Sequence, residues 1–168
     1  MKKLILVLML IPFVLFSQTD DSKTFTKVGQ VVPAFKVTAL DGKTIDITAM
    51  KGKVILLNFF ATWCGPCMQE MPLVEKEIWQ KLKSDDFIVL AVGREHSTEE
   101  LVKFNKEKGF TFSIAPDPKR GVYSLFAKEL IPRTYIIDKN GKIAFQSTGY
   151  DEKEFNNMID EIKKLLKK

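Results

Sequence analysis

An almost continuous apolar run, Val54–Ala61, is followed closely by the segment Trp63–Cys67, which reads WCGPC. Such a run is typical of a strand covered on both faces, as in a sheet that lies between helices. A helical pattern with one apolar side then continues to about Lys83. Pro72 lies inside this helix, and an interior proline should kink it. A buried strand, a cysteine pair and a helix in close succession constrain the fold more than any other feature.

The rest of the chain alternates between short strand patterns and helical patterns. The expected strands are Phe35–Thr38, Thr44–Ile47, Phe87–Val92, Phe110–Ala115, Thr134–Asp138 and Lys142–Gln146. Helices are expected after the capping residue Ser97, near Val122 and from about Asp151, and a turn is expected at Pro116–Pro118. This order predicts a single α/β sandwich in which helices cover both faces of a central sheet.

The first seventeen residues are expected to be a signal peptide. Lys2 and Lys3 precede the apolar stretch Leu4–Phe16, and the chain turns polar at Ser17. A basic start followed by 7–15 apolar residues is typical of an export signal. As a helix this stretch spans only about 20 Å of a hydrocarbon layer of roughly 30 Å, so a membrane anchor is the alternative. Residues 18–27 are expected to be a flexible linker, and residues 28–168 the folded domain.

The composition is that of a globular domain, with 45% apolar and 28% charged residues among 168. The net charge of +5 comes without a basic block in the middle of the chain, so no binding to nucleic acid is expected. The chain has two cysteines, Cys64 and Cys67, and a bridge across so short a loop removes little entropy from the unfolded state. The pair is therefore poorly placed as a structural staple. We expect neither a metal nor a cofactor.

The cysteine pair lies where a helix begins, and this placement favours disulfide exchange. Unpaired backbone N–H groups and the positive end of the helix dipole stabilise an anion there. Only the thiolate form of cysteine is nucleophilic. We therefore expect Cys64 to lie at the exposed end and attack a partner's disulfide, and the shielded Cys67 to resolve the mixed disulfide. Glu70 lies one helical turn further on and is expected to exchange the proton of Cys67, because burial would raise its pKa.

The segment Val54–Pro72 resembles the thioredoxin superfamily, and more narrowly the secreted TlpA/ResA-like thiol-disulfide oxidoreductases. The resemblance covers about residues 28–168 and implies a thioredoxin-like sandwich with a mixed sheet and an N-terminal hairpin. It implies that Cys64 and Cys67 are the redox pair and that the acidic residue at Glu70 tunes the second cysteine. Cytosolic thioredoxins carry a buried aspartate where this chain has Asn58. That departure favours the secreted subfamily, because an amide cannot titrate.

The resemblance also implies how substrates dock. It implies a cis peptide bond between Ile131 and Pro132, with the backbone of Ile131 pairing to a substrate chain by strand addition. We expect Trp63, Gly65 and Pro66, beside the cysteines, to complete this docking surface. The residues from about 95 to 118 resemble the extra helix–strand element of the subfamily.

The family implies protein disulfides or dithiols as substrates, with apocytochrome c thiols among them, and a membrane electron-transfer thiol partner. The Gly-Pro pair between the cysteines matches thioredoxin itself, and this favours the reducing direction. Together with the expected signal peptide, it predicts a reductant in the periplasm or elsewhere outside the cytoplasm.

Other functions stay open on the sequence alone. Residues 33–53 resemble the start of peroxiredoxin-like thiol peroxidases, but the Pro-x-x-x-Thr/Ser-x-x-Cys pattern of a peroxidatic cysteine is absent before Cys64. A binding module that only senses redox state is the non-enzymatic alternative. An inert disulfide and half of a zinc site are further interpretations of the pair. His96, the single histidine, is expected to be a surface loop residue without a role.

Overall fold

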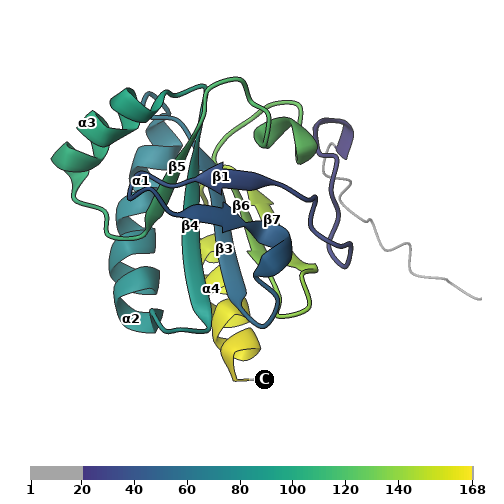
Figure 1. Cartoon of the computed structure of the whole chain (residues 1–168). Coiled ribbons are helices and arrows are strands. Elements are labelled where there is room, and N and C mark those ends of the chain that lie inside the picture. The colour runs from purple at the N-terminus through teal and green to yellow at the C-terminus, as the bar shows by residue number, and fades with distance from the viewer. Residues whose placement is uncertain (1–20, 168) are drawn as a thin grey trace, which may run out of the picture.

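The computed structural model describes residues 21–167 (Figure 1), so the expected signal peptide, residues 1–17, lies outside the described residues. The strands are β1 (Lys36–Thr38), β2 (Thr44–Asp46), β3 (Val54–Phe60), β4 (Phe87–Arg94), β5 (Ser113–Asp117), β6 (Arg133–Ile137) and β7 (Ile143–Thr148). The helices are α1 (Gly65–Leu73), α2 (Gln80–Leu82), α3 (Thr98–Lys108) and α4 (Glu152–Leu166). A π-helical stretch, Val74–Trp79, joins α1 to α2, and 3-10 helices occupy Asp21–Lys23, Ile47–Ala49 and Tyr123–Leu125.

Five strands form one mixed sheet in the order β5-β4-β3-β6-β7. The strands β3, β4 and β5 are parallel, whereas β6 runs antiparallel to both β3 and β7. The central strand β3 is buried over its whole length, as the apolar run predicts. The strands β1 and β2 form a separate antiparallel hairpin that lies across one face of the sheet (Figure 1).

Alternate residues of β3 face opposite sides of the sheet. Val54, Leu56 and Phe60 pack with apolar residues of α1, α3 and α4. Ile55 and Leu57 pack with the hairpin and with the short 3-10 helix that follows β5. The predicted α/β sandwich is therefore confirmed, with the long helices on one face and the hairpin and short helical turns on the other.

The structure corrects the boundaries expected after α3. Pro116, which we expected in a turn, is part of β5 and pairs with Gly93 of β4. A proline fits there because β5 is an edge strand, where a missing N–H is tolerated. The helix expected near Val122 is only the 3-10 turn Tyr123–Leu125. The buried Asp117 holds this turn, since its carboxylate accepts the backbone N–H of Tyr123 at 2.8 Å.

The linker expected over residues 18–27 differs from what the structure shows for residues 21–27. The backbone N–H of Phe25 donates to the carbonyl of Phe126 at 2.8 Å, and Thr24 forms a β-bridge with Ala127. The buried guanidinium of Arg133 donates to the Thr24 hydroxyl at 2.8 Å. This part of the chain is therefore hydrogen-bonded to the folded domain, because a cation buried on β6 finds its acceptors there.

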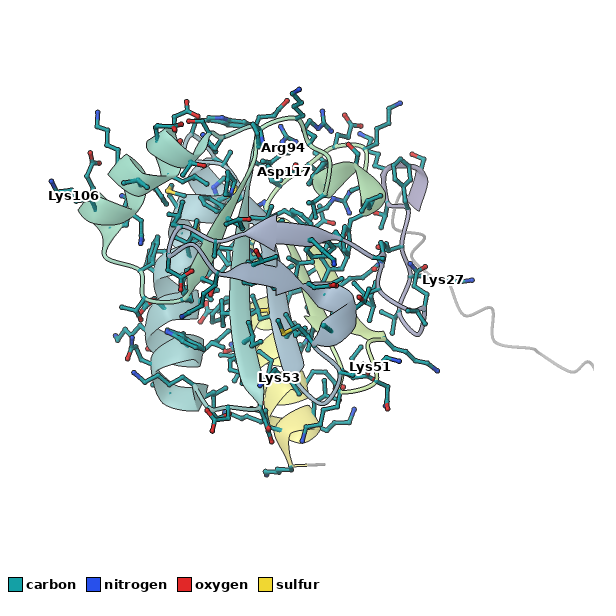
Figure 2. All side chains as sticks on the ribbon, viewed as in Figure 1. Lys27, Lys51, Lys53, Arg94, Lys106 and Asp117 are labelled. Carbon is teal, nitrogen blue, oxygen red and sulfur yellow. A yellow bond between two sulfur atoms is a disulfide. The ribbon has the colours of Figure 1, made fainter. Side chains whose placement is uncertain are left out.

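Within residues 21–167, none of the helices has the length and apolar character that crossing a membrane requires. Lys27 and Lys106 lie on opposite sides of the molecule (Figure 2), so the positive charge is not confined to one side. The capping box expected at the start of α3 is present, with Ser97 and Glu100 bonded to each other's backbone N–H groups.

Candidate active site

Cys64 and Cys67 form a disulfide at the first turn of α1, with a distance of 5.3 Å between their Cα atoms. Cys64 is the N-cap of the helix, and its sulfur accepts the backbone N–H of Cys67 at 3.2 Å. Gly65 and Pro66 occupy the first positions of the helix, where a proline's missing N–H leaves no gap in the hydrogen bonding. The sequence thus places one sulfur where a helix N-terminus favours negative charge.

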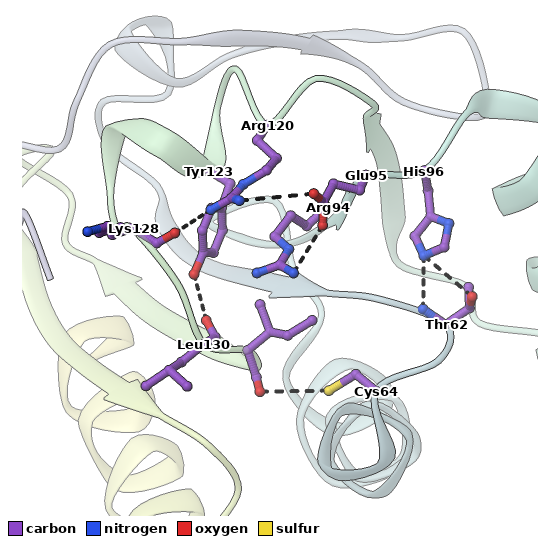
Figure 3. A network of polar contacts seen from close by, with 10 residues as sticks. Thr62, Cys64, Arg94, Glu95, His96, Arg120, Tyr123, Lys128 and Leu130 are labelled. Carbon is purple, nitrogen blue, oxygen red and sulfur yellow. Dashed lines mark hydrogen bonds and ion pairs between the residues drawn. The ribbon is translucent and has the colours of Figure 1, made fainter. Parts of the chain in front are cut away.

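The two sulfurs differ in access to solvent, although less than the sequence predicts. Cys67 is completely buried, whereas Cys64 keeps 5% of its surface exposed. The expectation of an exposed Cys64 is therefore wrong, although Cys64 is the less buried of the two cysteines. The carbonyl oxygen of Ile131 lies 3.7 Å from the Cys64 sulfur and covers it on one side (Figure 3).

The loop before β6 carries the cis peptide bond between Ile131 and Pro132, which confirms the prediction made from the family resemblance. A hydrogen bond fixes this loop: the Tyr123 hydroxyl donates to the carbonyl of Leu130 at 2.6 Å (Figure 3). Leu130 itself has a left-handed backbone, with φ of 74°. This arrangement brings the Ile131 carbonyl to the redox disulfide from a segment 67 residues further along the chain.

Glu70 lies one turn beyond Cys67 and is 3% exposed. Its carboxylate accepts the Thr134 hydroxyl at 3.0 Å and the Asn58 side-chain N–H at 2.8 Å. Asn58 also donates to the Thr134 hydroxyl at 2.8 Å, so the three side chains form a closed polar cluster in the core. Burial raises the pKa of Glu70 from its ordinary 4.5 to about 7, and the two hydrogen bonds oppose that rise. A carboxyl group that titrates near neutral pH can both accept and return a proton.

Comparisons with known proteins agree on what this site is. The Redoxin family model matches residues 27–166. The chain is 32% identical to the thiol-disulfide oxidoreductase ResA of Bacillus thuringiensis over 142 residues, and this alignment covers 84% of this chain and 82% of the relative. It is 34% identical over 163 residues to the thioredoxin-like protein YneN of Bacillus subtilis, covering 93% and 94% of the two chains. The chain belongs to the redoxin family, among the ResA-like thiol-disulfide oxidoreductases.

Solved structures support the same fold for this ResA-like oxidoreductase. A Bacteroides thetaiotaomicron protein assigned as a protein disulfide isomerase superposes with a TM-score of 0.83 at 34% identity, over 87% of this chain and 94% of that one. A Chlorobium tepidum protein assigned as the thiol:disulfide interchange protein DsbE gives a TM-score of 0.72 at 29% identity, over 83% and 98%. Disulfide exchange is therefore the activity of the Cys64–Cys67 pair, in preference to the peroxidase and binding-module alternatives.

Trp63, which the sequence places at the docking surface, lies beside the cysteine pair of this ResA-like site and next to a cluster of arginine and tyrosine side chains. Trp63 is 64% exposed directly beside Cys64. The guanidinium of Arg94 lies over its ring, 5.6 Å from the ring centroid, and over the ring of Tyr123 at 5.1 Å. Arg120 lies over Tyr123 at 5.2 Å. Sequence patterns did not reveal this stack, because Arg94, Arg120 and Tyr123 come from separate segments and carry no motif.

The expectation for His96 is wrong. Its side chain is buried, with 5% of the residue exposed, and it reaches the turn between β3 and α1 (Figure 3). There its Nε2 atom accepts the backbone N–H of Thr62 at 3.0 Å. The sequence gives no sign of this contact, since the two residues are 34 positions apart and a histidine before a helix cap is ordinarily exposed.

Proposed function

We propose that this ResA-like oxidoreductase reduces disulfides of protein substrates outside the cytoplasm, with Cys64 as the attacking and Cys67 as the resolving cysteine. The observation that carries the proposal is the asymmetric pair at the start of α1. Cys64 caps the helix and keeps 5% of its surface exposed, whereas Cys67 is completely buried.

The reaction transfers two electrons from the reduced pair to the substrate. The Cys64 thiolate attacks one sulfur of the substrate disulfide, which forms a mixed disulfide and releases one substrate thiolate. Cys67 then loses its proton and attacks the Cys64 sulfur, which releases the second substrate thiolate. The pair is left as the Cys64–Cys67 disulfide, and a second dithiol must reduce it before another cycle.

Glu70 is the proposed acceptor of the Cys67 proton. It lies one turn along α1 from Cys67, and its raised pKa makes the ionised and neutral forms both accessible near neutral pH. Asn58 on β3 and Thr134 on β6 donate to the carboxylate and hold it against the sheet. Cytosolic thioredoxins carry an aspartate at the position of Asn58 on β3, and here Glu70 on α1 takes that role.

The proposed docking surface consists of Trp63, Gly65, Pro66, Ile131 and Pro132. Trp63, next to Cys64 in the sequence, supplies exposed apolar area, and the backbone carbonyl of Ile131 lies against the Cys64 sulfur. An extended substrate segment that pairs with the Ile131 backbone would carry its own disulfide to Cys64.

The extracytoplasmic location rests on the sequence, where Lys2 and Lys3 precede the apolar stretch Leu4–Phe16. A reductant in an oxidising compartment needs electrons from elsewhere, and a membrane protein with a reactive dithiol is the proposed donor. The ResA name of the relatives makes apocytochrome c, with its cysteines in the disulfide form, a proposed substrate of this chain.

Trapping of mixed disulfides tests the cysteine roles. Cys67→Ser should accumulate covalent complexes with substrate proteins that dithiothreitol releases, and Cys64→Ser should accumulate none. Equal trapping by both variants would contradict the assignment of attacker and resolver.

The reduction potential of the pair tests the direction. We expect a value near that of thioredoxin, about −270 mV, and a value near the −120 mV of a strong oxidant would overturn the reductase proposal. Fractionation of cells that express the full chain tests the location, and recovery in the cytoplasm would contradict it.

A further inference from the structure

His96 connects the loop between β4 and α3 to the turn that carries Cys64. It follows β4 and precedes the cap of α3, and its ring extends to the turn that leads from β3 into α1 (Figure 3). Its Nε2 atom accepts the Thr62 backbone N–H at 3.0 Å and lies 3.4 Å from the Thr62 hydroxyl. Thr62 is two residues before Cys64, so the contact is made in the turn that carries the reactive sulfur.

The hydrogen bond fixes the state of the ring. A peptide N–H can only donate, so Nε2 must carry a lone pair and the ring proton of the neutral imidazole must be on Nδ1. Nδ1 lies 3.5 Å from a carboxylate oxygen of Glu100 on α3, and that same oxygen accepts the backbone N–H of Ser97 at 2.7 Å. The ring is therefore bonded to the turn before α1 through Nε2, whereas Nδ1 lies near Glu100 and, among the described residues, is buried without a hydrogen-bond partner.

The turn itself sets the position of the sulfur. The backbone N–H of Cys64 donates to the carbonyl of Ala61 at 3.1 Å, which closes the turn Ala61–Cys64 around Thr62. The Cys64 sulfur in turn accepts the backbone N–H of Cys67. A change in this turn would move the sulfur away from the N–H groups that stabilise its charge.

We propose that His96 is a positioning residue for disulfide exchange: its unprotonated Nε2 holds the Ala61–Cys64 turn and thereby keeps the Cys64 sulfur against the start of α1. Protonation of the ring places two N–H donors face to face and releases the turn. The charged groups around the ring are Glu100 of α3 and, before it on the chain, Arg94 and Glu95, which pair with each other at 3.0 Å. On the facing turn the titratable group is Cys64 itself, once it is reduced.

Two substitutions separate positioning from packing. His96→Gln keeps an acceptor in the side chain and cannot be protonated, whereas His96→Leu fills the space without an acceptor. The measurement is the rate of alkylation of reduced Cys64 by iodoacetamide between pH 5 and 9, where Cys67 is shielded by burial. It needs no substrate protein, so it stands even if the proposed reductase direction fails.

We expect His96→Leu to slow alkylation at pH 7 by about threefold to tenfold, because the sulfur loses its alignment with the helix end. His96→Gln should stay close to the wild-type rate at pH 7. Ser97→Ala is the matched control, since it weakens the same end of α3 and leaves the contact between His96 and Thr62 intact. It should leave the alkylation profile unchanged.

Equal slowing by the Gln, Leu and Ser97→Ala variants would overturn the proposal, and so would an unchanged profile in His96→Leu. A direct check comes from ¹⁵N NMR, because the chain has a single histidine and its ring signals need no assignment. The proposal requires the proton on Nδ1 in the folded protein at neutral pH, and a proton on Nε2 refutes it.

Discussion

Replacing Glu70 by glutamine should make the protein more stable at neutral pH and remove a pH dependence. Burial raises the pKa of Glu70 from 4.5 to about 7, so the folded state binds this proton more tightly than the unfolded state. Stability is therefore greatest below about pH 4.5 for this group and is lost as the pH rises through 7. At about 1.4 kcal/mol for each pH unit between the two values, ionising Glu70 costs the fold about 3 kcal/mol.

Urea unfolding of the oxidised protein between pH 4.5 and 8.5 measures this effect. The free energy of unfolding of the wild type should fall by about 3 kcal/mol relative to Glu70→Gln across that range, with the change centred between the two pKa values. Glu107→Gln, on the exposed side of α3, is the matched control and should follow the wild type. Parallel curves for the wild type and Glu70→Gln would refute the argument that burial holds this carboxyl near neutrality.

Three further substitutions test the surroundings of the site. Asn58→Asp places a second carboxyl against Glu70, so the urea midpoint should fall at pH 8.5 and recover at pH 5, because two adjacent carboxylates cannot both ionise cheaply. Tyr123→Phe removes the hydrogen bond to the Leu130 carbonyl, which should lower stability by about 1 kcal/mol and slow reduction of a protein disulfide more than of a small one. Gly93→Ala brings a methyl group within 2.7 Å of a buried leucine on α3, which should lower the unfolding free energy by about 1–3 kcal/mol in the same assay.

Local patterns predicted those parts of the fold that depend on neighbouring residues. The run Val54–Phe60 is the buried central strand, and the Ser97 capping box begins α3. Each of these features is decided within a few residues, so a single sequence contains the information.

Contacts between distant segments were not predictable in the same way. The sequence around Pro116 predicts a turn, and only the sheet order shows that Pro116 belongs to an edge strand, where proline is tolerated. The burial of His96 depends on Thr62, and the covering of Cys64 depends on Ile131. The cis bond between Ile131 and Pro132 follows only from the family resemblance, because local sequence does not distinguish it from a trans bond.

The cluster of Asn58, Thr134 and Glu70 explains how a carboxyl can titrate near neutrality inside this core. The ionised carboxylate is satisfied by two donors, the Thr134 hydroxyl and the Asn58 N–H. A neutral Glu70 carries a proton of its own and needs an acceptor. Among the residues that the structure describes, the Asn58 side-chain oxygen is buried without a partner, and a half-turn of the amide would present it to that proton. An amide can thus serve both charge states of its neighbour. An aspartate at the same position would compete with Glu70 for the proton, so the amide on β3 suits the acid on α1 to which it is hydrogen-bonded.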